Sequence, residues 1–310
     1  MKKSIVTNTL FVIIIIILSS ENANCQEKIN ILESNQLEQI IINDTTFQKF
    51  SGNVIVKYAD LTIICDTILI DEYKDNMAGW GNTHIFNDTL NCKSDSINLL
   101  QSKSLIKFYD NTFVKTDNLT IHSNQLEYNF NLKKIRYFFG GKVIKNKNSI
   151  TSKLFTHDLQ NNNSNFNQLV YIKNDDYEVK SDNLSYSGDL INFTGPTVIT
   201  NSKLTINGFN GYLEDNNILE FNTGVIVQFE DKEIQSQHLK RYLDKDKSDF
   251  HQNIKIKIDE QTYIYGEKMT HVNNTFTITK DCKIDLIDAK DTISITGNSI
   301  YINDEAKKID

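Results

Sequence analysis

The chain has 310 residues, of which 39% are hydrophobic, and it carries a formal net charge of −7. An acidic chain is a poor candidate for binding nucleic acid, because phosphates attract basic surfaces. The sequence has one proline, Pro196, and no stretch in which apolar residues recur at helical spacing. This pattern favours a protein built from β-strands throughout.

The first 25 residues are typical of an export signal. Two lysines precede an apolar segment at residues 10–18 that is too short to cross a bilayer. Ala23 and Cys25 place small residues at the −3 and −1 positions of a cleavage site before Gln26. Lipid attachment to Cys25 is the alternative, although the residues before it make a poor lipid-attachment motif. We predict a signal peptide at residues 1–25 and an exported chain whose net charge is −8 after cleavage.

The rest of the chain is repetitive, with a period of about 29 residues. The string SNQLE occurs at Ser34–Glu38 and again, three periods later, at Ser123–Glu127. Related residue pairs mark ten units at nearly even spacing. Their second members, called anchors below, are Asn35, Asp66, Asp95, Asn124, Lys153, Asp182, Phe209, Gln237, Glu267 and Asn298. A fixed period of this length indicates an array of structural repeats, so we predict one repetitive domain over residues 26–310.

Turn-forming residues recur about every 14 residues, in two interleaved series. The first series begins at Ala59-Asp60, and the second begins at Lys74-Asp75-Asn76. This spacing predicts two antiparallel strands per unit, or about twenty strands of roughly 10–12 residues each. A parallel β-helix, as in polysaccharide lyases, fits less well because two turn series indicate strands that run back and forth.

Apolar residues flank the anchors. In nine of the ten units, the residue three before the anchor and the residue two after it are both apolar; the exception pairs Ile206 with Gly211. The separation between the two is odd, so their side chains would point to opposite faces of a straight strand. Both can face one interior only if the strand bends or bulges at the anchor, where small and turn-tolerant residues are suited.

The predicted fold is therefore all-β: an elongated, antiparallel, V-shaped trough of bent strands with an apolar inner face. The candidate inward-facing residues are Leu32, Leu37, Ile63, Ile68, Ile97, Ile121, Leu126, Phe155, Val179, Leu184, Ile206, Ile234, Leu239 and Ile264. The first and last strands of such a sheet have unpaired edges.

Several segments resemble a known family. The cadence of Phe50–Val56, Leu61–Asp66 and Ile68–Ile70 is similar to that of the LptA/OstA-like periplasmic proteins of lipopolysaccharide transport. Tyr177–Tyr186 followed by Phe193–Ile199 resembles the OstA-like proteins of the Bacteroidetes type. The likeness covers roughly residues 28–304, although each motif is short.

This resemblance implies a β-jellyroll trough in the periplasm, without enzymatic activity or a cofactor. The inward-facing residues would form a groove for the acyl chains of lipopolysaccharide, or a related glycolipid, on its way from the inner to the outer membrane. The strand edges would join Lpt-type partners of both membranes, or copies of this chain head to tail. The alternative is a secreted scaffold or adhesin whose core is filled by its own side chains.

Other residues carry weaker signals. The six histidines lack metal-ligand spacing. Asp66, Asp95 and Asp182 share the anchor position with asparagine, lysine and glutamine, which favours a structural role at the bend over catalysis or calcium binding. Cys65 and Cys92 would lie about 9–10 Å apart across a return strand, beyond disulfide reach, so we predict free thiols. No phosphate-binding loop or serine elbow is present.

A basic cluster occupies residues 133–147. It contains Lys133, Lys134, Arg136, Lys142, Lys145 and Lys147. We interpret it as a solvated basic turn; a rim position near anionic head groups is the alternative.

Overall fold

The structure is a computed structural model that describes residues 28–71, 73, 76–229, 232–288, 291–303 and 308–309. The predicted signal peptide lies outside the described residues. Within them, 24 β-strands form one sheet, and one short 3-10 helix, η2, covers Gln101–Lys103. These residues contain no helix that is long and apolar enough to cross a membrane. The fold is all-β and antiparallel, as predicted.

The strands follow one another along the chain. The first twelve are β1 (Asn30–Glu33), β2 (Gln36–Ile42), β3 (Thr45–Tyr58), β4 (Leu61–Asp71), β5 (Asn76–Phe86), β6 (Asn91–Leu100), β7 (Leu105–Lys115), β8 (Thr120–Asn129), β9 (Lys134–Tyr137), β10 (Gly141–Lys145), β11 (Asn148–Ser152) and β12 (Leu154–Asp158). The others are β13 (Asn163–Lys173), β14 (Glu178–Ser187), β15 (Leu190–Thr200), β16 (Leu204–Glu214), β17 (Ile218–Phe229), β18 (Lys232–Ser236), β19 (His238–Tyr242), β20 (Lys247–Lys257), β21 (Thr262–Val272), β22 (Thr275–Ile287), β23 (Thr292–Asn303) and β24 (Lys308–Ile309).

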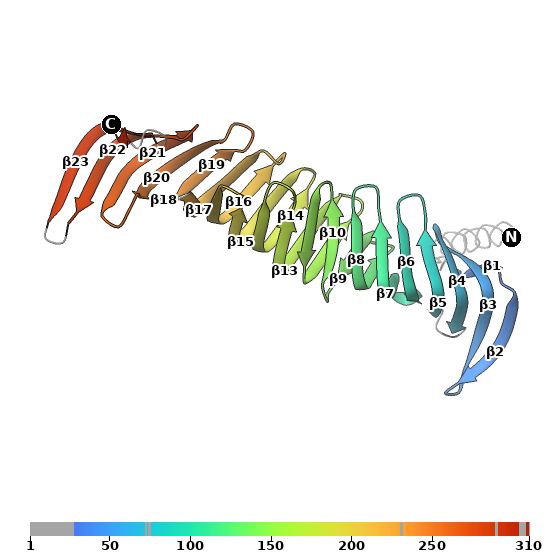
Figure 1. The fold of residues 1–310 in the computed structure, drawn as a ribbon. Coiled ribbons are helices and arrows are strands. Elements are labelled where there is room, and N and C mark those ends of the chain that lie inside the picture. Colours follow the sequence, from blue (N-terminus) through green and yellow to red (C-terminus); the bar gives the residue numbers. More distant parts are fainter. Residues whose placement is uncertain are drawn as a thin grey trace, which may run out of the picture.

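Most strands pair with the strands that precede and follow them in the chain, which produces a long row of strands from the N-terminal to the C-terminal end (Figure 1). Four positions in the row hold two short strands end to end. β1 and β2 both pair with β3, β9 and β10 with β8, β11 and β12 with β13, and β18 and β19 with β17. Because four positions hold two strands each, the 24 strands occupy about as many positions as the twenty strands predicted.

The strands bend where the sequence predicts it. In β4, Ile63, Cys65 and Ile68 are buried while Asp66 between them is exposed, so the alternation of inward residues shifts by one at the anchor. The register with β5 is irregular at the same point, between Ile64 and Thr67. At the anchors Asn35, Lys153 and Gln237 the strand itself is interrupted. The predicted bend is confirmed.

The neighbouring return strands carry the left-handed residues that make the bend. Gly81-Asn82 in β5 and Asp110-Asn111 in β7 all have positive φ. A bulge of two such residues turns the strand sharply, and glycine, asparagine and aspartate tolerate this conformation best. Asn82 Nδ2 donates to Asp66 Oδ2 at 3.0 Å. Asn111 Nδ2 donates to the next anchor carboxylate at 2.7 Å. Asp66 and Asp95 therefore stabilise the bend, and the Gly-Asn and Asp-Asn pairs mark its position in the sequence.

The bent strands enclose one continuous apolar core. Buried residues from Phe50 in β3 to Ile302 in β23 belong to a single cluster. Cys65, Cys92 and Cys282 are buried free thiols, as predicted for the first two. Burial raises the pKa of Cys65 to about 12, and burial also raises the pKa of Cys92. Low thiolate content makes these cysteines structural rather than reactive.

The structure corrects the position of Leu32. Leu32 lies at an irregularity of β1 and is 64% exposed. The inward position belongs to Ile31, which pairs with the buried Val56 and packs against the core. The repeat spacing placed the inward residue one position too late, because the bulge in β1 reverses the face of the residues that follow it.

Candidate functional site

Twelve of the fourteen predicted groove residues face the interior and are buried, each at most 3% exposed: Ile63, Ile68, Ile97, Ile121, Leu126, Phe155, Val179, Leu184, Ile206, Ile234, Leu239 and Ile264. Neighbouring side chains fill the interior around them. Phe155, for example, lies between Tyr137 and Phe166, with ring centroids 5.0 and 4.9 Å away. The trough is therefore packed around these residues.

The inner face is uncovered at the two ends. Leu37 in β2 pairs with the inward Phe50, yet it is 61% exposed because no further strand of the described chain covers it. At the other end, Ile295 in β23 pairs with Ile284 and is 52% exposed. β24 pairs only with the last two residues of β23. Among the described residues, the remaining length of β23 is a free edge.

The trough has two rims, formed by the two predicted series of turns and by one further turn, at residues 43–44, that precedes the second series. The first rim contains the turns at residues 59–60, 87–90, 116–119, 146–147, 174–177, 201–203 and 258–261, and the second contains those at 43–44, 101–104, 130–133, 159–162, 188–189, 215–217, 243–246 and 273–274. Several turns of the first rim share one pattern of side-chain-to-backbone hydrogen bonds. The side-chain oxygen of Asn87, Asn174, Asn201 or Asp259 accepts hydrogen bonds from the backbone N–H groups two and three residues later.

Side chains bridge the mouth of the trough from rim to rim. Lys133 Nζ lies 3.2 Å from Asp60 Oδ2. Tyr177 OH donates to Asn216 Oδ1 at 3.1 Å. Lys203 Nζ lies 3.3 Å from an oxygen of Asp246. These contacts join residues 39 to 73 positions apart, so they are visible only in the tertiary structure.

The mouth holds a cavity of about 660 Å³ between the turns at residues 201–203 and 243–246. Its apolar lining comes from the inner face of β15–β17 and the adjoining turns: Ile199, Leu204, Ile206, Leu213, Leu219 and Leu243. The charged groups at its rims are Lys147, Asp176, Lys203, Arg241 and Asp246. An apolar cavity with a few convergent polar groups is typical of a small-molecule site.

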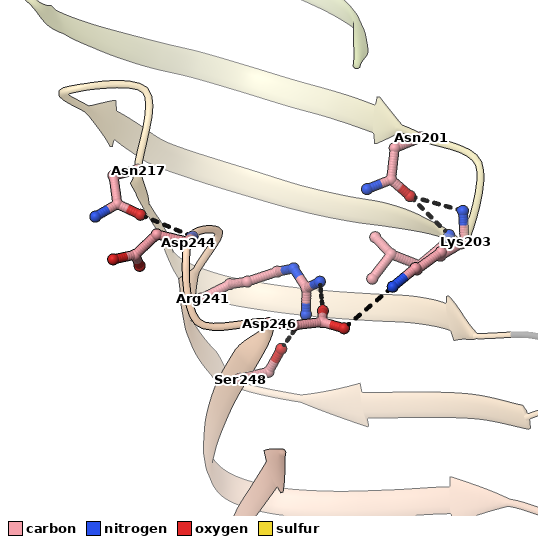
Figure 2. A network of polar contacts seen from close by, with 8 residues as sticks. Asn201, Lys203, Asn217, Arg241, Asp244, Asp246 and Ser248 are labelled. Atoms are coloured by element: carbon pink, nitrogen blue, oxygen red, sulfur yellow. Dashed lines mark hydrogen bonds and ion pairs between the residues drawn. The ribbon is translucent and has the colours of Figure 1, made fainter. Parts of the chain in front are cut away.

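A buried arginine organises the charged side of this cavity (Figure 2). Arg241 is only 4% exposed. Its Nη1 donates to Ser248 Oγ at 2.7 Å, and its Nη2 donates to Asp246 Oδ1 at 2.5 Å. Burial by itself would raise the pKa of Asp246, but the hydrogen bonds and charges of Arg241 and Lys203 lower it. Asp246 is therefore ionised at neutral pH and links both cations.

Three residues of the basic cluster at 133–147 form separate ion pairs. Arg136 Nη2 lies 2.7 Å from Glu127 Oε2. Lys133 bridges the rims, and Lys134 Nζ lies 3.7 Å from Asp158 Oδ2. Lys145 departs from the predicted solvated turn. It is buried over the ring of Tyr186, with Nζ 4.3 Å from the centroid, and burial lowers its pKa.

His157 is a buried histidine at the mouth, where its Nδ1 lies 2.9 Å from Ser164 Oγ. Burial, together with the charge of Lys145, lowers its pKa from 6.5 to about 4, against the opposing effect of Asp158. No group of three or more histidine, cysteine, aspartate or glutamate residues is arranged to hold a metal within the described part of the chain. His157 is thus a neutral hydrogen-bonding group.

We expect acid to destabilise the protein through His157. The unfolded chain binds a proton there near pH 6.5, whereas the folded chain resists protonation until about pH 4, so stability falls as the pH falls through this window. At about 1.4 kcal/mol per pH unit the loss is on the order of 3 kcal/mol. Urea unfolding at pH 7 and pH 4.5 should show a smaller difference for His157→Gln than for the parent. The exposed His122→Gln variant should match the parent; an unchanged difference in His157→Gln would contradict the assignment.

Comparisons with known proteins identify the family. No curated protein sequence matches this chain. Among solved structures, it is similar to LptH, the LptA homologous periplasmic component of the lipopolysaccharide transport device from Pseudomonas aeruginosa. That likeness has 12% identity and a TM-score of 0.30, and covers 33% of this chain and 76% of the other. A model of the OstA-like protein family matches residues 26–182, half of the chain. The chain belongs to the OstA-like protein family.

Proposed function

We propose that this OstA-like protein binds lipopolysaccharide or a related glycolipid in the periplasm and carries it from the inner to the outer membrane. The acyl chains would enter the apolar interior through the mouth, and no covalent step is required. The observation that supports this most directly is the cavity at the mouth, whose apolar lining continues into the core.

The physical basis is burial of hydrocarbon. Removing an acyl chain from water stabilises a complex by about 0.8 kcal/mol per buried CH₂ group. A cavity of about 660 Å³ has the volume of a site for a drug-sized ligand. A glycolipid with several chains would require the rim-to-rim contacts to separate. The two ion pairs among these contacts join partly exposed side chains and are individually weak, so the mouth can open at modest cost.

The ends of the sheet support the proposed partners. Apolar inner-face residues remain exposed at both ends, at Leu37 and Ile295. Among the described residues, the outer sides of β2 and β23 lack a neighbouring strand over most of their length. An Lpt-type protein of either membrane, or a second copy head to tail, could add a strand there and continue the apolar face.

A scaffold or adhesin with a filled core is the second candidate. The close packing around Phe155 and the other buried groove residues favours it. Such a protein would not need a cavity at the mouth, and its apolar interior would never contact lipid. The two functions therefore differ in whether glycolipid reaches Ile199, at the cavity wall.

A photo-crosslinking residue at Ile199 separates the two functions. Ile199 points into the cavity, while its neighbour Thr200 is exposed. In living cells we expect a lipopolysaccharide adduct from position 199 and none from position 200, with both variants folded. If position 199 gives no adduct in a correctly folded protein, the transport function is wrong and the scaffold is favoured.

A further inference from the structure

The chain contains two arginines, and they occupy opposite environments. Arg136 lies on the outer face of the sheet, partly exposed, and pairs with Glu127. Arg241 is more than nine-tenths buried and lines the mouth cavity. Burying a guanidinium is costly unless it is fully paired, so the position of Arg241 requires an explanation that Arg136 does not.

Arg241 is incompletely paired in this structure. Ser248 and Asp246 accept from its two terminal nitrogens, but its buried Nε has no hydrogen-bond partner among the described residues. A guanidinium presents its donors in a planar fork that matches the oxygens of a phosphate or carboxylate. One donor of this fork is therefore unused, in a residue that lines an apolar cavity.

The only carboxylate bound to Arg241 among the described residues is that of Asp246, which can turn outward into solvent. Asp246 belongs to a surface turn, with a side chain 41% exposed to solvent. It is shared with Lys203, whose side chain is 65% exposed. Lys147 also lines the cavity, and Asp176 is the second acidic residue of its lining. With Asp246 turned outward, two lysines and Arg241 would face a single aspartate.

We propose that this cavity binds an amphipathic lipid by its phosphorylated head group, with the phosphate replacing Asp246 as the partner of Arg241 and Lys203. An acyl chain would lie against Ile199, Leu204 and Leu219. This inference rests on the proposed glycolipid-binding function and adds to it a fixed position along the trough and a requirement for phosphate. Asp246 acts as the internal competitor that keeps the cations paired when the cavity is empty.

Lipid binding by the purified chain tests the proposal. The probes are monophosphoryl lipid A, the same lipid with its phosphate removed, and inorganic phosphate, each measured by native mass spectrometry. The phosphorylated lipid should bind about tenfold more tightly than its dephosphorylated form, a difference typical of a charge-assisted contact. Arg241→Gln should abolish this preference while still binding the dephosphorylated lipid. Arg136→Gln is the matched control and should keep the preference.

Asp246→Asn gives an independent readout if Arg241→Gln is unstable. Removing the competing carboxylate should increase affinity for the phosphorylated lipid about tenfold and leave the dephosphorylated lipid unaffected. Equal binding of the two lipids by the parent chain would overturn this inference while leaving the transport function intact. Binding of neither lipid, together with no adduct at position 199, would overturn both. Tight binding of inorganic phosphate alone would also overturn it, because the site would then recognise a free anion.

Discussion

Replacing Gly211 with leucine should destabilise the protein by about 3 kcal/mol, although leucine is a common residue at this position of the repeat. Gly211 is the exception among the apolar pairs, two residues after its anchor Phe209. It pairs directly with Phe221 in β17, whose ring is completely buried. A side chain at Gly211 would collide with that ring and with the carbonyl oxygen of Glu220. Urea unfolding measures the loss.

Two variants control for this interpretation. Ile68 occupies the equivalent position in β4, where the partner on the following strand is Gly79 instead of a phenylalanine. Ile68→Leu should therefore cost less than about 1.5 kcal/mol. Phe221→Ala should cost about 3–5 kcal/mol through the cavity it leaves. The double variant Gly211→Leu/Phe221→Ala should cost less than the sum of the two, since leucine then fills vacated space. A neutral Gly211→Leu would show that Phe221 does not exclude a side chain there.

Deleting one complete repeat should leave a folded, shorter trough. Removal of the segment 96–124 joins the anchor Asp95 to Gln125, so the second half of β6 is replaced by that of β8. Each strand packs mainly on its immediate neighbours, and arrays of this kind tolerate loss of an internal unit. The deletion should retain a β-type circular dichroism spectrum and a cooperative thermal transition. The sheet should be shorter by about 9–10 Å, the width of two strands.

Deleting half a repeat should prevent the C-terminal part from folding onto the sheet. Removal of the segment 96–109 joins Asp95 to Asp110 and deletes a single strand's length. Every later strand would then run in the wrong direction between the two rims. Only a mirror image could restore both the strand direction and the order along the trough, and L-residues cannot supply it. If this variant folds as well as the complete-repeat deletion, the strands do not alternate between two distinct rims.

The parts of this fold that depend on neighbours along the chain follow from the sequence alone. The repeat period, the two turn series and the inward pairs such as Ile63 and Ile68 were all readable, because turns and side-chain alternation are local properties. The family was also recognisable from short motifs. The wrong inward position predicted for Leu32 also has a local cause, because a bulge shifts the alternation of side chains without leaving a clear sign in the sequence.

What fills the trough and what meets across it depend on contacts between strands and between rims. The residue that fills the space beside Gly211 is Phe221, on the next strand. The partner of Lys203 is Asp246, 43 positions later on the other rim. The cavity beside Arg241 exists because two rims that are far apart in sequence meet there around an imperfectly filled core. Packing between walls depends on the shapes of residues that no local pattern brings together, so the candidate binding site could not be found before the fold.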